Sequence, residues 1–257
     1  CTRAEVGSEP VNIMHFKRFV SDWAFAHPEE IQKIYASGVQ KAPDTSGSGK
    51  KVAIVGAGPA GLTAANDLIR KGYSVTVFEA LPAPGGMMRV GIPEYRLPYD
   101  LLQREVDEII SRGVELKLNH RVEDVTGLLK DFDAVFVAAG AHIGIKLPIP
   151  GNDLPEVHIT TDFLREVSLT GTSNIQSKIK NKRVLVLGGG NVAIDAAMSS
   201  VRLGASWVGM SCLESREKMP AHDWEVRDAQ EEGIDVSPGR TFKEVTNKDG
   251  HVIGVRT

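Results

Sequence analysis

Two short glycine-rich segments are the part of this sequence best suited to chemistry. They read Gly-Ala-Gly-Pro-Ala-Gly at residues 56–61 and Gly-Gly-Gly-Asn-Val-Ala at residues 188–193. Each follows an apolar run typical of a buried strand and precedes an alanine-rich stretch typical of a helix. Glycines in that setting allow a tight turn and a close approach of pyrophosphate to the helix amides. One such motif is weak evidence, but two in matching context predict two nucleotide sites and electron transfer between their cofactors.

The first glycine turn has a carboxylate at the expected distance. Gly56 permits the turn, Gly58 leaves room for a pyrophosphate, and Gly61 lets the helix pack close to the strand. Glu79 follows Gly61 by eighteen residues, at the end of the next apolar run. A carboxylate there can accept both hydroxyl protons of an adenosine ribose. The alternative, a structural turn with an exposed glutamate, is disfavoured because all the parts match.

The stretch after this carboxylate favours a flavin at the first site. Gly85 and Gly86 are adjacent, so the backbone there can lie against a flat ring system. Residues 133–141 form an apolar run that ends in small residues, where the chain could pass close to a cofactor. Met87 and Met88 are interpreted as core filling rather than as redox groups.

The second turn repeats the same logic. Gly188, Gly190 and Ala193 occupy the three turn positions, with Asn191 at the expected helix start. Asp195 is assigned to the first helical turn, where the helix dipole favours an acid. Simple capping and positioning of a nicotinamide remain equal alternatives for Asp195.

The elements that must position these turns alternate between strands and helices, which predicts parallel sheets with helices on their faces. Residues 11–36 have a helical apolar period interrupted at His27-Pro28, and residues 38–49 have the composition of a linker. The expected elements are strand 51–55, helix 59–71, strand 74–78, helix 98–112, strand 114–118, strand 133–138, strand 183–187, helix 191–203, strand 206–211, helix 222–232, and a hairpin of 242–245 with 252–256.

Length and composition exclude several classes of protein. The chain has 257 residues, 42% of them hydrophobic and 25% charged, which suits two ordinary globular domains. A net charge of −3 gives no reason to expect nucleic acid or an anionic membrane as partner. No apolar run approaches the roughly 20 residues of a membrane span, so membrane insertion is not expected. Two cysteines cannot form a disulfide framework, and a reducing cytoplasm is therefore the expected compartment.

The motif order resembles the family of the glutamate synthase small subunit. This family includes the flavin and NADPH domains of dihydropyrimidine dehydrogenase and the large subunit of NADH-dependent ferredoxin:NADP oxidoreductase. The resemblance runs over essentially the whole chain. Its motifs are Glu-Pro-Val-Asn-Ile at 9–13, the first glycine turn, Gly-Gly-Met-Met-Arg-Val-Gly-Ile-Pro-Glu-Tyr-Arg-Leu-Pro at 85–98, Ile-Pro-Gly at 149–151, the second turn through Asp195, and Met-Pro-Ala at 219–221.

The resemblance implies an α/β fold with two Rossmann-like nucleotide-binding domains of the disulfide-reductase type and a short N-terminal helical segment. Residues 1–48 would be that segment and a linker, following an iron–sulfur domain absent from this chain. Residues 49–145 would be an FAD-binding domain that lacks its C-terminal part, and 146–257 an NAD(P)H-binding domain that is also expected to be incomplete. Because the chain begins with Cys-Thr-Arg and closes on a hairpin, it is interpreted as a piece of a longer polypeptide.

Specific residues take on cofactor roles through this resemblance. The implied FAD-binding residues are Gly56, Gly58, Pro59, Ala60, Gly61, Glu79, Ala80, Gly86, Met87, Arg89, Ile92, Arg96, Ala139 and Gly140. The implied nicotinamide-nucleotide residues are Gly188, Gly190, Asn191, Val192, Asp195, Glu214 and Arg216.

The second site departs from the family pattern at one place. Relatives that use NADPH carry paired arginines where this chain has Leu213 and Glu214. A carboxylate repels a 2′-phosphate but accepts hydrogen bonds from a free 2′-hydroxyl, which favours NADH. Arg216 and Ala193 are compatible with NADPH, so both nucleotides remain open.

The expected function is hydride transfer from NADH or NADPH to FAD, with electrons passing on to iron–sulfur centres of the same or a partner subunit. Cys1 matches the last ligand of a [4Fe–4S] cluster in the family, so it is a candidate thiolate ligand of a cluster held mostly outside this chain. Iron–sulfur or flavin-containing redox subunits are the expected partners. The alternative is a non-catalytic scaffold domain within a larger redox complex.

Overall fold

The computed structural model describes residues 3, 6–7, 9–37, 49–170 and 172–257. Contacts between residues divide the chain into two compact units, Cys1–Asp44 and Thr45–Thr257. Most of the predicted linker, residues 38–49, lies outside the described residues.

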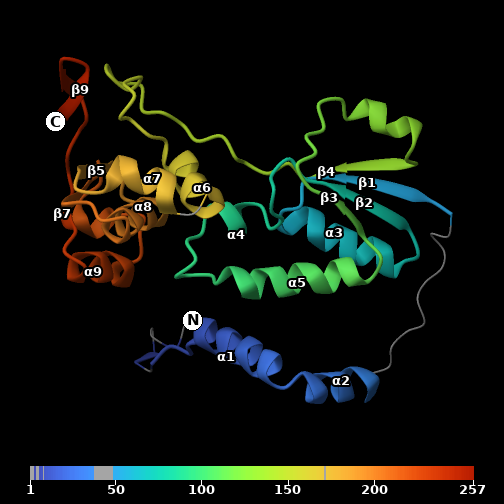
Figure 1. The fold of residues 1–257 in the computed structure, drawn as a ribbon. Helices are drawn as coiled ribbons and strands as arrows, with labels where there is room; N and C mark the ends of the chain where they lie inside the picture. Colours follow the sequence, from blue (N-terminus) through green and yellow to red (C-terminus); the bar gives the residue numbers. More distant parts are fainter. Residues whose placement is uncertain (1–2, 4–5, 8, 38–48, 171) are drawn as a thin grey trace. The chain divides into compact units, whose positions relative to one another are not determined.

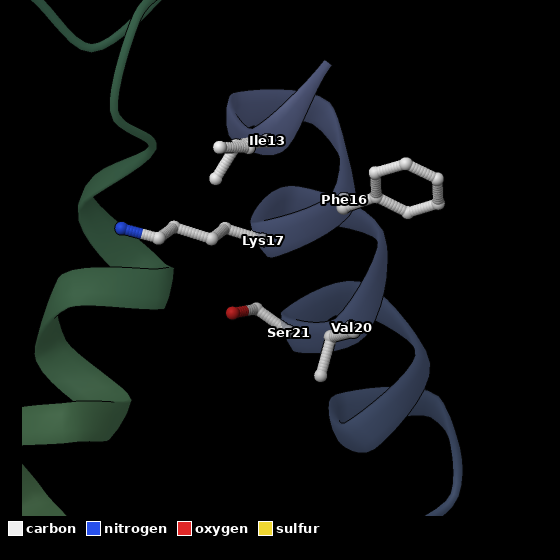
Figure 2. A pocket seen from close by; sticks show the side chains of 5 residues that line it. All are labelled: Ile13, Phe16, Lys17, Val20 and Ser21. Carbon is white, nitrogen blue, oxygen red and sulfur yellow. The ribbon is translucent and has the colours of Figure 1, made fainter. Parts of the chain in front are cut away.

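The described residues of the first unit include α1 (Ile13–Ala26) and α2 (Pro28–Ser37). The predicted interruption at His27 is confirmed, because α2 begins with Pro28, whose fixed φ suits the first helical position. The apolar side chains of α1 lie on its surface, and Phe16 and Val20 are each more than half exposed. Figure 2 shows these two among the five side chains that line a hollow on α1.

The first half of the second unit is a four-stranded parallel sheet in the order β3-β2-β1-β4. Helices α3 and α5 lie on one side of this sheet (Figure 1). Apolar residues of β1 and β2, among them Ile54 and Val77, pack with α3 and α5 into one core. The elements of this half are β1 (Lys51–Val55), α3 (Pro59–Arg70), β2 (Ser74–Phe78), α4 (Met87–Val90), α5 (Tyr99–Ser111), β3 (Glu115–Lys117), η2 (Thr126–Lys130) and β4 (Ala134–Val137).

The second half repeats the arrangement with a three-stranded parallel sheet in the order β5-β6-β7. Its core is separate from the first, and Ile194 of its central helix is completely buried there. A two-stranded antiparallel hairpin follows. The elements of this half are α6 (Thr160–Thr170), α7 (Thr172–Ile179), β5 (Arg183–Leu187), α8 (Asn191–Arg202), β6 (Trp207–Ser211), η3 (Arg216–Lys218), α9 (Asp223–Glu231), β7 (Asp235–Ser237), β8 (Glu244–Lys248) and β9 (His251–Arg256).

The α/β class with parallel sheets is confirmed, and strands 51–55, 74–78 and 183–187 agree with prediction to the residue. The sequence did not predict α4, α6, α7 or β7. Within the part of the chain that the structure describes, none of the helices has both the length and the apolar character needed to cross a membrane.

Candidate functional site

The first glycine turn is built by close backbone contacts. Gly56 has a φ of +109°, and a Cβ there would overlap the carbonyl oxygen of Ala138, just beyond β4. A Cβ on Gly61 would overlap the carbonyl oxygen of Gly56. These two glycines therefore let β1, α3 and the end of β4 meet in the geometry predicted from the sequence.

Gly58 has a different environment and leaves space for a ligand. Its nearest neighbour among the described residues would be the Cα of Gly86, 3.7 Å from an added Cβ. Gly58 is also the N-cap of α3, so the first amides of that helix have no acceptor within it. Gly85 donates its amide to the carbonyl oxygen of Ala57 at 2.8 Å, which holds the glycine pair against the turn. Such a cradle of exposed amides at a helix N-terminus fits a diphosphate.

Glu79 lies beneath this turn and is buried, with 7% of its surface exposed. Its Oε2 accepts the Ala57 amide at 2.8 Å, and its Oε1 accepts the Leu81 amide at 2.9 Å. The alternative of an exposed glutamate is therefore wrong. Each carboxylate oxygen has further acceptor capacity, which a ribose hydroxyl can use. That ribose contact stays a prediction.

The second turn, like the first, begins with a glycine of positive φ and has an open glycine at the N-cap of the following helix. Gly188 has a φ of +147°, and Gly190 is the N-cap of α8. No heavy atom of the described residues lies within 4 Å of a Cβ added at Gly190, so the space above this helix N-terminus is open. The segment 219–222 closes on the turn, because Ala221 donates its amide to Gly189 at 3.0 Å. This cradle also fits a diphosphate.

Glu214 lies beside the second turn. Its Oε2 would be 3.3 Å from a Cβ on Gly189, the middle residue of the turn, just as Glu79 contacts the middle residue of the first. Cys212 is buried next to it, and burial together with the Glu214 charge raises the pKa of this thiol. Cys212 is therefore a packing residue of the second core.

The remaining predicted residues of the second site lie around this turn. Arg216 forms an ion pair with Asp223 at 3.0 Å, and the Asp223 side chain is 92% exposed. Asn191 accepts the His222 amide through its Oδ1 at 3.3 Å, and Val192 is half exposed at the helix start.

Asp195 does not lie where the sequence analysis assigned it. It is the fifth residue of α8, and the first turn of that helix holds no acidic residue. The capping role was therefore wrong, because the helix begins at Asn191 and the dipole acts mainly on its first turn. Asp195 instead accepts hydrogen bonds from Arg96 and, at 3.2 Å, from the Tyr95 hydroxyl.

Arg89 and Arg96, both predicted for FAD, contact the second half. Arg89 donates to the Ser168 hydroxyl at 2.7 Å, and its guanidinium lies 3.6 Å from the centre of the Tyr99 ring. Arg96 pairs with Asp195 and, at 2.8 Å, with Glu225. Their flavin roles stay predictions, but the contact with Asp195 is one that sequence reasoning missed.

The other predicted residues of the first site fall into three groups. Ala139 lies 3.3 Å from a Cβ added at Gly56, and Gly140 follows it with a φ of +68°. Met87 and Ile92 are half-buried and joined by a backbone hydrogen bond of 3.1 Å. The exposed residues near the first turn are Pro59, Ala60 and Ala80.

The proposed iron–sulfur ligand Cys1 lies outside the described residues. Across the described ranges, histidine, cysteine and acidic side chains nowhere form a group of three or more that could hold a metal ion.

Comparison with known proteins now identifies the family. Residues 50–257 match the family described as pyridine nucleotide-disulphide oxidoreductase. The chain belongs to this family. A relative is subunit beta of the NADP(+)-dependent formate dehydrogenase of Moorella thermoacetica, 43% identical over 91% of this chain and 35% of its own length. The glutamate synthase [NADPH] small chain of Escherichia coli is 35% identical over 88% of this chain and 48% of its own length. The resemblance to the glutamate synthase small subunit is thereby confirmed.

Solved structures agree with this pyridine nucleotide-disulphide oxidoreductase fold. FprA from Mycobacterium tuberculosis in complex with NADPH aligns with a TM-score of 0.59 at 23% identity, covering 71% of this chain and 47% of FprA. Lactococcus lactis thioredoxin reductase aligns with a TM-score of 0.59 at 22% identity, covering 80% and 70% of the two chains. The chain spans about a third to a half of the length of the first curated relatives that it matches.

Proposed function

We propose that this chain takes electrons into a flavin-dependent oxidoreductase by passing hydride from a nicotinamide nucleotide to FAD. The observation that carries the proposal is the duplicated cradle. Each turn has an open glycine at a helix N-cap, Gly58 or Gly190, and a carboxylate facing its middle residue, Glu79 or Glu214. Two dinucleotide cradles in one chain suit a reaction between two nucleotide cofactors.

The two halves of the second unit would bind different nucleotides. Residues 49–145 would bind FAD and residues 146–257 NAD(P)H, in keeping with their separate cores. The amides that begin α3 and α8 would bind the two diphosphates, and Glu79 would orient the adenosine end of FAD. FAD supplies the chemistry, because its flavin accepts a hydride from a reduced nicotinamide. The chain's own contribution is to bind and orient both nucleotides.

We further propose NADH as the preferred reductant. Glu214 lies beside the middle residue of the second turn, which supports a role at the adenosine ribose, and Arg216 is paired with Asp223. A carboxylate at that place disfavours a 2′-phosphate. The names of the relatives include both nucleotides: the formate dehydrogenase is NADP(+)-dependent, whereas subunit PreT of Salmonella typhimurium, 34% identical, is NAD-dependent.

Electrons would leave the flavin for iron–sulfur centres of the same polypeptide or of a partner subunit. Several relatives are named as subunits, which supports a redox partner. Cys1 would supply one thiolate ligand to a cluster. Iron analysis of the full-length protein tests this part, and an iron-free protein would contradict it.

The test of the function is an anaerobic visible spectrum of the full-length protein titrated separately with NADH and NADPH. Bleaching of a flavin band by NADH at the lower concentration is the expected result. Bleaching at lower NADPH concentration would retain the reaction and reject the NADH preference. A protein without a flavin band, or with a flavin that neither nucleotide reduces, would indicate a non-catalytic scaffold.

A further inference from the structure

The connection between α4 and α5 carries two side chains of the first half into contact with the second. Tyr95 and Arg96 lie in this connection, which runs from the first half toward α8 and α9 (Figure 1). Arg96 is only 21% exposed, and its partners Asp195 and Glu225 are exposed by 11% and 5%. These three side chains therefore form a largely desolvated cluster between the two nucleotide-binding halves.

All three guanidinium nitrogens of Arg96 point to residues of the second half. Nε donates to Asp195, Nη1 lies 2.8 Å from Glu225 Oε1, and Nη2 lies 4.0 Å from the Met198 sulfur. The second oxygen of Glu225, Oε2, is buried and has no hydrogen-bond partner among the described residues. Arg96 is therefore the cation that compensates two buried carboxylates, which are costly to leave unpaired.

Tyr95 extends the contact along α8. Its hydroxyl donates to Asp195 at 3.2 Å, and its ring lies 4.1 Å from the guanidinium carbon of Arg202, the last residue of that helix. Arg202 is held in turn by both oxygens of Glu232, at 2.7 and 2.8 Å. The pair Tyr95-Arg96 thus contacts α8 in its middle, at Asp195, and at its last residue, Arg202.

The position of α8 determines the second nucleotide site, because its N-cap is Gly190 and its first amides face the open cradle. Asp195 is four residues after Asn191, one turn along the same helix. Any movement of α8 relative to the first half would move the second cradle relative to the first. A fixed separation matters for hydride transfer, since small misplacements of reacting groups cost large factors in rate.

We propose that Arg96 is a positioning residue that fixes the second nucleotide cradle to the flavin-binding half through Asp195 and Glu225, and that it does not bind flavin. The proposal rests on the proposed function. It differs from the role that the family resemblance implied for Arg96, because the guanidinium is fully engaged by the second half. Arg96 would act on the reaction by orienting α8.

The test compares Arg96→Gln, Asp195→Asn and the double variant in the full-length protein, with Arg227→Gln as the control. Arg227 is an exposed arginine on α9, the helix that carries Glu225. FAD content, the rate of flavin reduction at saturating NADH and the KM for NADH are measured for each. Arg96→Gln and Asp195→Asn should retain FAD and lower the reduction rate about tenfold or more. The double variant should be no slower than Arg96→Gln, because both changes remove one interaction.

Two outcomes would overturn the proposal. Loss of FAD in Arg96→Gln together with an unchanged rate in Asp195→Asn would make Arg96 a flavin ligand. Multiplied losses in the double variant would make Asp195 act on the nicotinamide independently of Arg96. If Arg96→Gln does not fold, Arg96→Lys replaces it, since a lysine keeps the charge but cannot reproduce the forked contacts.

A second readout separates this proposal from the proposed function. Hydrogen exchange of the α8 amides can be measured without turnover. It therefore tests whether Arg96 holds α8 in place even if neither nucleotide reduces a flavin. Faster exchange along residues 191–202 in Arg96→Gln, with no change in Arg227→Gln, is the expected result. Unchanged exchange of the α8 amides in Arg96→Gln would contradict the positioning role of Arg96, whatever rate of flavin reduction the variant shows.

Discussion

Glu214 lies beside the middle residue of the second glycine turn, as Glu79 does at the first, although the strand register aligns Glu79 with Cys212, two residues earlier. The proposed choice of nucleotide depends on this carboxylate. Glu79 accepts the amide of Ala57, and Glu214 lies beside Gly189. A carboxylate at the second position accepts hydrogen bonds from a free 2′-hydroxyl and repels a 2′-phosphate. The proposed preference for NADH therefore depends on the Glu214 side chain, and a single substitution there should reverse it.

Glu214→Arg should move the preference toward NADPH. The change removes the repulsion and adds a forked donor for phosphate, so the ratio of kcat/KM for NADPH over NADH should rise about 10- to 100-fold. Steady-state kinetics with both nucleotides measures this ratio. Glu231→Arg makes the same change of charge at an exposed position at the end of α9 and serves as the matched control. An unchanged ratio in Glu214→Arg would reject the assignment of Glu214 to the ribose.

Gly58 and Gly61 should respond differently to the same methyl group. Gly58→Ala has only an ordinary contact with Gly86, so its stability should stay within about 1 kcal/mol of the unsubstituted chain while its FAD content falls. Gly61→Ala would overlap the Gly56 carbonyl and should lose about 2–4 kcal/mol of unfolding free energy. Urea unfolding and flavin absorbance separate the two effects. Full flavin occupancy in Gly58→Ala would show that no diphosphate lies against this glycine.

The sequence predicts the residues of each glycine turn, but it does not predict the contact between the two nucleotide-binding halves. The roles of Gly56 and Gly61 follow from local spacing, because a strand, a turn and a helix are neighbours in the chain. Arg96 and Asp195 are 99 residues apart, and only the folded arrangement brings them together. From the sequence, Arg96 was assigned to FAD, and Asp195 to helix capping or to positioning the nicotinamide. In the structure the two side chains form an ion pair with each other.

At the scale of elements, prediction succeeded where the apolar pattern was long and regular. Strands β1 and β5 are apolar runs after one charged residue, β2 alternates valine with serine and threonine, and each strand is followed by a glycine or a charged residue. Helix α4 is a single turn inside a glycine-rich segment, and β7 has three residues, so neither has enough length for a period. Helix α6 was missed because only Phe163 and Leu164 of its eleven residues are buried, too few to mark an apolar face.

The hairpin of β8 and β9 is held by the Glu156 carboxylate and by a backbone hydrogen bond of 2.9 Å from the Val245 amide to the Pro150 carbonyl oxygen. Glu156 accepts the Val252 amide at 2.7 Å and lies 3.2 Å from the His251 ring nitrogen. The Val252 amide, followed by His251, holds the pKa of Glu156 below its ordinary value of 4.5. A carboxyl group whose pKa is lowered by folding stabilises the fold above that ordinary value, and the stabilisation is lost as the pH falls through the folded pKa.

Glu156→Gln should therefore expose the Val252 amide to faster hydrogen exchange at pH 7, because the amide loses a charged acceptor. The difference between the two proteins should shrink as the pH falls through the lowered pKa of Glu156, because the carboxyl group then becomes protonated in the folded chain. Amide exchange corrected for its intrinsic pH dependence gives the measurement. Equal protection of Val252 in both proteins at pH 7 would show that Glu156 does not secure the hairpin.

At the scale of the whole chain, the repeated motif predicted the repeated architecture. Each half has its own parallel sheet and its own buried core, so the order of strands and turns was sufficient to anticipate the fold class. The side-by-side contact of α4 with α6 was not predicted, since it depends on two helices that the sequence pattern did not indicate. The predicted division at residues 145–146 remains a proposal about binding.

Separate cores imply that each nucleotide should stabilise its own half more than the other. A ligand that binds only the folded state adds RT ln(1 + [L]/Kd), roughly 2.7 kcal/mol at one hundred times Kd. In flavin-depleted full-length protein, FAD at that ratio should slow exchange of core amides in β1 and β2 by up to about 100-fold. Those of β5 and β6 should be slowed less, because only interface contacts such as that of Arg89 with Ser168 transmit the effect.

Nicotinamide nucleotide should give the reverse pattern, with the greater protection in β5 and β6. Exchange followed by mass spectrometry resolves these strands, and a nucleotide-free sample at the same ionic strength is the control. Equal protection of both halves by either ligand would mean that the two cores unfold as one cooperative unit. In that case the ion pairs of Arg96 would be part of a single core, and the two halves could not move independently during catalysis.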